Sequence, residues 1–100
     1  MKFLVESDNG KWHLATYTAY DAYENPYGEF DNQREAIQCV LDKGEGLVKR
    51  YVVAFDKDDN IIYEDVDEIF VWGLTPKILT PARKQLLKTS EIKAKKFIKR

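Results

Sequence analysis

The residue types that carry nucleophilic chemistry are scarce in this chain, which has one cysteine, Cys39, and one histidine, His13. A cysteine nucleophile needs a base within hydrogen-bonding reach and a third group that orients this base. His13 stands beside Trp12 in a stretch typical of a strand, far along the sequence from Cys39. We therefore interpret Cys39 as a small hydrophobic residue on the flank of a helix rather than as a nucleophile.

A second candidate for chemistry is the segment DKDDN, in which Asp56, Asp58 and Asn60 alternate like the first ligands of a calcium-binding loop. The match ends there, because Ile61 stands where such a loop needs Gly and Asp67 stands where it needs Glu. We predict a solvated hairpin turn at this place.

Paired carboxylates suited to acid–base chemistry are frequent, but each pair consists of neighbours in sequence. Neighbouring residues of a strand point to opposite faces, so a catalytic pair would need carboxylates from different strands. The candidates for such a pair are Asp56, Glu64, Asp65 and Glu68. No Gly-rich phosphate loop, serine nucleophile motif or zinc-ligand spacing occurs. We expect a protein that is not an enzyme and that uses no metal or cofactor, with a cross-strand carboxylate enzyme as the weaker alternative.

The first stretch suited to binding is YTAYDAYENPYGEF, residues 17–30, in which five aromatic residues are interleaved with carboxylates. Tyr offers a large, rigid contact surface with a polar tip and is enriched among residues that dominate binding energy. The carboxylates argue against nucleic acid, because they would repel phosphates. We predict that the stretch contacts a protein partner, although some of its rings could instead pack over the sheet. The predicted contacts are Tyr20, Tyr23, Glu24 and Tyr27.

The formal net charge of −1 conceals a division of the chain. Residues 1–76 have seven Lys or Arg and sixteen Asp or Glu, a charge of −9, whereas residues 77–100 have nine and one, a charge of +8. Such asymmetry indicates an interaction segment. We interpret residues 1–76 as an acidic α+β sheet domain and residues 77–100 as a basic helical segment of the same domain.

Projected as a helix, the C-terminal segment has an apolar stripe opposite a basic face. The stripe comprises Leu86, Leu87, Ser90, Ala94, Phe97 and Ile98. The basic face could contact phosphates without reading sequence, since Lys acts as a point charge. The helix could also dock in a partner's groove, lie on an anionic membrane, or pack its stripe on the sheet and leave the lysines solvated. The candidate phosphate contacts are Lys84, Lys88, Lys95, Lys96, Lys99 and Arg100.

The elements that must position these residues follow from apolar periodicity and turn signals. We expect strands at 2–7 and 11–20 joined by an Asn-Gly turn, an irregular loop or edge at 21–30, and a helix at 32–43 capped by Asn32 or, shifted by one residue, by Asp31. We expect strands at 47–55 and 61–66, an interruption at Asp67 and Glu68, and an extension of the sheet at 69–73. A last helix is expected from Pro81 towards Arg100, with fraying or a break near Thr89 and Ser90.

The fold class follows from the order of these elements. One hundred residues suit a single domain, and consecutive strands joined by tight turns favour an antiparallel sheet. We therefore predict an α+β fold in the order β-β-α-β-β-(β)-α. It has four to five strands, one helix packed on the sheet and a basic amphipathic C-terminal helix.

The predicted function is that of a small interaction or regulatory protein. It would bind, and by binding inhibit, a protein partner through the Tyr-rich loop, the basic helix or both. The alternative is non-specific nucleic-acid binding, and an open edge strand would also allow two copies to pair as a homodimer. No apolar run is long enough to span a membrane, and a single cysteine fits a reducing compartment, so we expect a cytoplasmic protein without membrane insertion.

Overall fold

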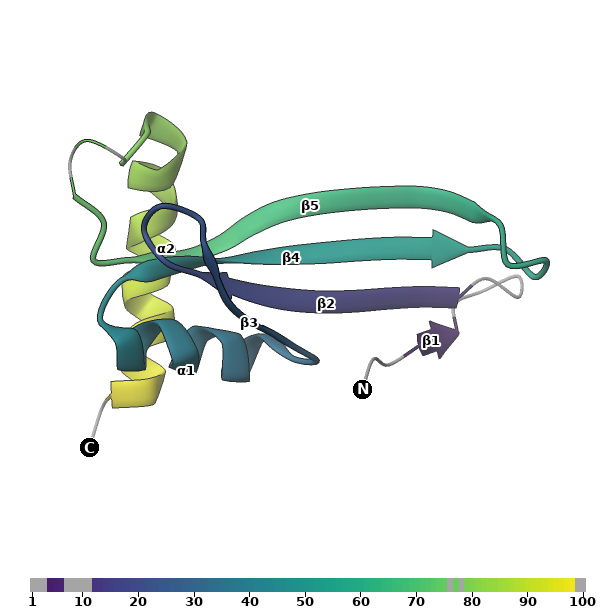
Figure 1. The fold of residues 1–100 in the computed structure, drawn as a ribbon, viewed down its shortest axis with the longest axis horizontal. Coiled ribbons are helices and arrows are strands. Elements are labelled where there is room, and N and C mark those ends of the chain that lie inside the picture. Colours follow the sequence, from purple (N-terminus) through teal and green to yellow (C-terminus); the bar gives the residue numbers. More distant parts are fainter. Residues whose placement is uncertain (1–3, 7–11, 76, 78, 99–100) are drawn as a thin grey trace.

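The computed structural model describes residues 4–6, 12–75, 77 and 79–98, and in them five strands and two helices build the expected α+β fold (Figure 1). The elements are β1 Leu4–Glu6, β2 Trp12–Tyr20, β3 Pro26–Phe30, α1 Gln33–Lys43, β4 Gly46–Phe55, β5 Ile61–Trp72 and α2 Pro81–Ile98. The predicted Asn-Gly turn before β2 lies outside the described residues. No helix within the described ranges is both long enough and apolar enough to cross a membrane.

All strand pairs of the sheet are antiparallel, and β2 and β4 form its centre. They pair along their whole length, from Trp12 opposite Phe55 to Tyr20 opposite Leu47. On the other side of β2, β1 pairs with its first half and β3 with its second half. On the other side of β4 lies β5, and within the described residues no strand pairs with the outer edge of β5.

The presence of β3 corrects the prediction of an irregular stretch over residues 21–30. A tight turn stands between β2 and β3, because the Asp21 carboxylate accepts the backbone N–H groups of Tyr23 and Asn25 at 2.8 and 2.9 Å. Such carboxylate-to-backbone bonds stabilise turns locally. Pro26 then begins the strand, a position where its missing N–H is tolerated.

The continuity of β5 corrects a second expectation, the interruption at Asp67 and Glu68. Arg50 on β4 donates to the Asp67 carboxylate at 2.8 Å, and Arg83 on α2 pairs with Glu68 at 2.7 Å, so both charges have arginine partners within the fold. The register shifts at this point, where Ile69 is an extra residue relative to β4. The charged residues therefore mark a bulge rather than the end of a strand.

Helix α1 forms where the sequence places its caps, and it covers one face of the sheet as expected. The Asn32 side chain accepts the Glu35 N–H at 2.9 Å, and Gly44 ends the helix in the left-handed region at φ 92°. The buried face of α1 packs on the sheet beneath β2, β4 and β5, where the core forms. The core residues are Ala19, Ala36, Ile37, Val40, Val48, Phe70 and Ala94.

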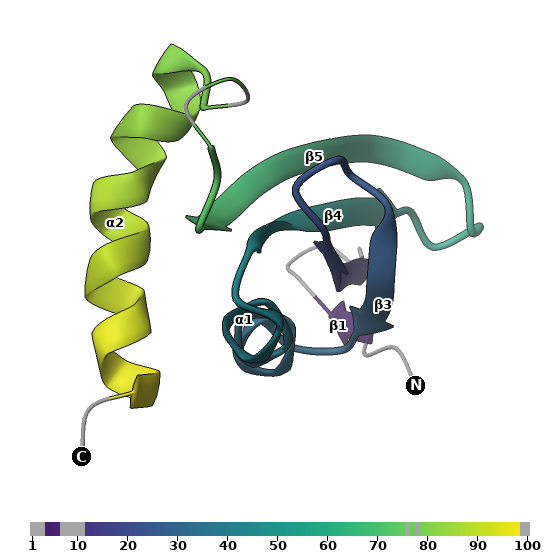
Figure 2. The same ribbon diagram turned by 60° about the vertical axis from the view of Figure 1, so that its left-hand side comes forward.

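The molecule is elongated because both helices lie at one end of the sheet (Figure 1). Strands β2, β4 and β5 continue well beyond the helices, and Figure 2 shows α2 standing outside the sheet next to β5. The radius of gyration is 15.0 Å, whereas a compact domain of this length has about 13 Å. The far half of the β4–β5 hairpin therefore projects from the helical layer.

Candidate protein-binding surface

Helix α2 covers the near part of the β5 edge. The Val71 N–H donates to the buried hydroxyl of Ser90 at 2.9 Å, and the Lys93 ammonium donates to the Ile69 carbonyl at 3.2 Å. Two backbone groups that point out of the sheet thus find partners on the helix. The predicted break near Thr89 and Ser90 is wrong, because the Ser90 hydroxyl serves the strand and the helix runs on unbroken.

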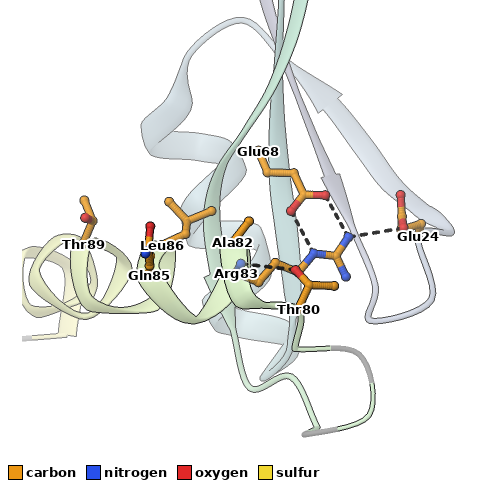
Figure 3. A pocket seen from close by; sticks show the side chains of 8 residues that line it. All are labelled: Glu24, Glu68, Thr80, Ala82, Arg83, Gln85, Leu86 and Thr89. Carbon is orange, nitrogen blue, oxygen red and sulfur yellow. Dashed lines mark hydrogen bonds and ion pairs between the residues drawn. The ribbon is translucent and has the colours of Figure 1, made fainter.

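The first turn of α2 is attached to the sheet by an arginine–carboxylate cluster (Figure 3). The Arg83 guanidinium donates two hydrogen bonds to Glu68, at 2.8 and 2.7 Å, and a third to Glu24 at 3.3 Å. Lys49 on β4 donates to the same Glu24 at 2.6 Å. The Arg83 side chain is 12% exposed, so its charge is committed to the protein's own carboxylates.

The cluster shifts the pKa values of Glu24, Lys49 and Arg83 in the directions expected for ion pairs. The hydrogen bond from Lys49 lowers the pKa of Glu24, and the same bond raises the pKa of Lys49. The hydrogen bonds to Glu68 raise the pKa of Arg83. Each of these three shifts favours the charged form of its group, as expected for a group paired with an opposite charge.

An open hollow of about 900 Å³ lies beside this cluster, between the β2–β3 turn, β5 and α2. Its lining comprises Glu24, Glu68, Thr80, Ala82, Arg83, Gln85, Leu86 and Thr89. The charged groups in the lining bond to one another, as Figure 3 shows. Across the described part of the chain, no three His, Cys, Asp or Glu side chains gather closely enough to hold a metal ion.

Of the four carboxylates considered for an enzyme, Glu68 alone lines this hollow. Glu64 and Asp65 pair with successive β4 residues and so point to opposite faces of the sheet. Asp56 instead accepts the backbone N–H groups of Asp58 and Asn60 at 2.8 and 2.9 Å. These bonds build the β4–β5 turn, and the prediction of a hairpin turn at this place is confirmed.

Cys39 and His13 lie on different elements and far from each other. Cys39 is half-buried on α1, where burial raises the pKa of its thiol. His13 stands near the beginning of β2, opposite Ala54, and β2 begins at the end of the sheet that lies away from the helices (Figure 1). The two side chains therefore form no nucleophile–base pair.

Tyr20 and Tyr27, two of the predicted partner contacts, pack within the fold. The Tyr20 ring lies beneath the Lys49 ammonium, which is 5.2 Å from the ring centre. The half-buried Tyr27 hydroxyl donates to the Glu45 carbonyl at 3.0 Å. These contacts give both rings a structural role, which is the alternative that the sequence left open.

Tyr23 and Glu24, the other two predicted partner contacts, lie in the tight turn between β2 and β3. The Tyr23 side chain is 75% exposed. Glu24 has a positive φ of 67° and uses its carboxylate to bind Lys49 and Arg83. Among the four predicted residues, Tyr23 alone presents an exposed aromatic ring.

The predicted phosphate contacts that the structure describes are exposed on the outer face of α2. They are Lys84, Lys88, Lys95 and Lys96, and no ion pair involves them within the described residues. Glu91 and the 61% exposed Ile92 share this outer face. Lys99 and Arg100, the other two predicted contacts, lie outside the described residues.

The surface that sequence reasoning missed is the far part of the outer edge of β5, residues 61–66, hereafter the open edge. All six side chains are exposed, and four of them are apolar or aromatic. The exposed fractions are 56% for Ile61, 47% for Ile62, 53% for Tyr63 and 56% for Val66. A row of unpaired backbone groups beside apolar side chains is a template for another strand.

The signal in the sequence was the run IIYEDV itself, which reads as an ordinary strand. Whether a strand edge is covered depends on the path of α2, which the sequence does not reveal.

No protein-family model, curated protein or solved structure matches this chain. The function must therefore be inferred from the surfaces described above.

Proposed function

We propose that the protein is a non-enzymatic interaction protein that binds and thereby regulates a protein partner, and that the partner docks along the open edge of β5. The observation that carries the proposal is the exposure of four large apolar side chains along a strand edge with which no strand of the described structure pairs. Natural sheets normally cover, shorten or charge such an edge, because it otherwise recruits other chains.

The dimensions of the open edge suit the binding of a strand. Six residues of extended chain span about 20 Å, the length of an ordinary strand. In this mode of recognition, the backbone hydrogen bonds supply affinity and the side chains on either face supply specificity. The near end of the edge leads to Glu68 and the hollow beside α2.

Site-specific photocrosslinking tests this proposal in the cells that make the protein. Three single variants each carry a photoreactive phenylalanine analogue. It replaces Tyr63 on the open edge, Lys88 on the basic face of α2 or, as the control, Glu35 on the exposed side of α1. We expect a discrete protein adduct from position 63 and none from position 35. An adduct from position 88 alone would move the docking surface to α2. No discrete adduct from any position would contradict the proposal.

A second candidate function is non-specific nucleic-acid binding, which is favoured by four exposed lysines of α2 that have no ion-pair partner in the described part of the chain. Four phosphate contacts would give a slope of about −3 to −4 in a plot of log affinity against log salt. Glu91 lies on the same face and would repel phosphates, which weakens this candidate.

Fluorescence anisotropy of labelled DNA and RNA oligonucleotides tests this second candidate across a salt series. The comparison is between the wild-type protein and the triple variant Lys84→Glu, Lys88→Glu and Lys95→Glu. Steep salt dependence that the triple variant abolishes would support it. Binding that persists in the variant, or a flat salt dependence, would exclude these lysines as phosphate contacts.

A further inference from the structure

The open edge carries negative charge that no cation of the described ranges neutralises. Of the four carboxylates on β5, Asp67 and Glu68 have arginine partners. Glu64 accepts a hydrogen bond from the neutral Tyr51 hydroxyl, and Asp65 has no ion-pair partner within the described residues. Residues 56–66 together contain five carboxylates and one lysine.

The charges and apolar groups of the open edge are distributed over both faces of the sheet. Pairing with β4 places Tyr63 and Asp65 on one face and Glu64 and Val66 on the other. A strand laid beside β5 would therefore meet one apolar group and one carboxylate on each face. Cross-strand pairs of apolar residues and of opposite charges stabilise a sheet, so the complementary pattern is apolar-basic-basic-apolar.

We infer that the occupant of the open edge is an extended basic segment of a partner protein, with two adjacent Lys or Arg residues flanked by apolar residues. This inference rests on the proposed function and adds the chemistry of the partner. The cations would face Glu64 and Asp65, and the flanking residues would pack beside Tyr63 and Val66.

A second copy of the chain fits the open edge less well. In an antiparallel pair of two β5 strands, opposite residues point to the same face of the sheet, so a pair centred on Glu64 or on Asp65 would place that carboxylate opposite its own copy. Centring the pair on Val66 would instead place Asp65 opposite Asp67. Like charges directly opposite each other destabilise a strand pair, so the acidic residues disfavour self-pairing in these registers, whereas a basic chain would meet opposite charges.

The test uses a fluorescently labelled eight-residue peptide in which two lysines are flanked by valine and isoleucine, titrated with the full-length protein. Two further versions carry backbone N-methyl groups at alternate residues, in the odd or in the even positions. In a strand pair only one of these sets faces β5. We expect one version to bind about fivefold more weakly for each hydrogen bond lost, and the other to retain binding.

Charge reversal on the protein tests the basic character of the occupant. The double variant Glu64→Lys and Asp65→Lys should bind the lysine peptide about tenfold more weakly and prefer a peptide with glutamates in place of the lysines. The control variant Asp42→Lys and Glu91→Lys makes the same change in net charge at exposed positions on the two helices. It should change the affinity less than about twofold.

The outcomes separate the two levels of the proposal. Equal binding of the lysine and glutamate peptides, with the N-methyl asymmetry retained, would overturn the basic occupant and leave strand addition in place. Equal loss in both N-methyl versions would point to a helical or irregular occupant and overturn the extended one. No binding of the lysine peptide by a wild-type protein that still crosslinks from position 63 would overturn the basic segment alone. A dimer in sedimentation that Val66→Lys disrupts would assign the edge to a second copy.

Discussion

The attachment of α2 to β5 depends on Ser90, and its replacement by Ala tests how much this contact contributes. The Ser90 hydroxyl is fully buried and accepts the Val71 N–H at 2.9 Å. Ser90→Ala leaves that N–H buried without a partner, which costs about 1–3 kcal/mol. For a domain of this size, each 1 kcal/mol lowers Tm by about 4–8 °C. We therefore expect Tm to fall by at least about 4 °C.

Urea unfolding followed by circular dichroism and tryptophan fluorescence measures this effect. Trp72 lies beside Glu91 and Ala94 of α2, so its emission also reports whether the helix is docked. The slope of the unfolding free energy against urea concentration, m, reports how much surface is exposed on unfolding. An unchanged m in the variant would mean that α2 unfolds together with the sheet. A smaller m would mean that the variant's native state has already released the helix.

The neighbouring residue provides the matched control for this experiment. Thr89 is exposed, so Thr89→Ala should change stability by no more than about 0.5 kcal/mol. Equal stability of the Ser90→Ala and Thr89→Ala variants would refute the contribution assigned to the hydrogen bond between helix and strand.

Three further predictions concern backbone strain and charge. Gly46→Ala should destabilise the fold by about 3 kcal/mol or more, because φ at Gly46 is 144° and a Cβ would collide with the Tyr20 carbonyl oxygen. Thermal unfolding measures this loss of stability. A loss below about 1 kcal/mol would contradict the prediction. Asp59→Gly should raise stability by about 0.5–1 kcal/mol, because Asp59 has a φ of 66° that glycine adopts without strain; a lower Tm would contradict this. The lowered pKa of Glu24 means that its pairing with Lys49 stabilises the fold above the ordinary pKa of 4.5 and is lost as the pH falls through the lower folded-state pKa. Unfolding at several pH values should therefore show a deficit for Glu24→Gln that shrinks in acid, and a deficit independent of pH would refute it.

The parts of the fold that could be predicted from the sequence are those set by local chemistry. The Asn32 cap, the apolar face of α1 and the start of α2 at Pro81 all follow from residues within one or two helical turns. The two long strands of the β4–β5 hairpin follow in the same way from apolar runs on either side of the DKDDN turn.

The β2–β3 hairpin was missed because Pro26 and Gly28 were read as breakers of regular structure. A better signal was present, since DAYEN at residues 21–25 and DKDDN at residues 56–60 share the pattern of Asp, an acidic residue three positions later, and then Asn. In both turns the first Asp accepts two backbone N–H groups, and the acidic residue has a positive φ. The comparison of the two segments would have predicted β3.

The candidate binding surface could not be predicted, because residues 61–66 form an open edge only where α2 does not cover β5. The apolar stripe of α2 indicated docking, but nothing in the sequence indicated that Ser90 and Lys93 would meet the backbone at Val71 and Ile69. These two contacts hold α2 over the near part of the β5 edge, and residues 61–66 remain exposed. Long-range geometry of this kind depends on the whole core rather than on any local pattern.

The central claim is that residues 61–66 of β5 receive another strand, and amide hydrogen exchange measured by NMR tests it most directly. In the free protein, alternate amides of this segment should exchange rapidly, because those that point away from β4 have no hydrogen-bond acceptor. With the lysine peptide at about a hundred times its Kd, the same alternate amides should slow about a hundredfold. Unchanged exchange of these amides under saturating peptide would contradict the claim.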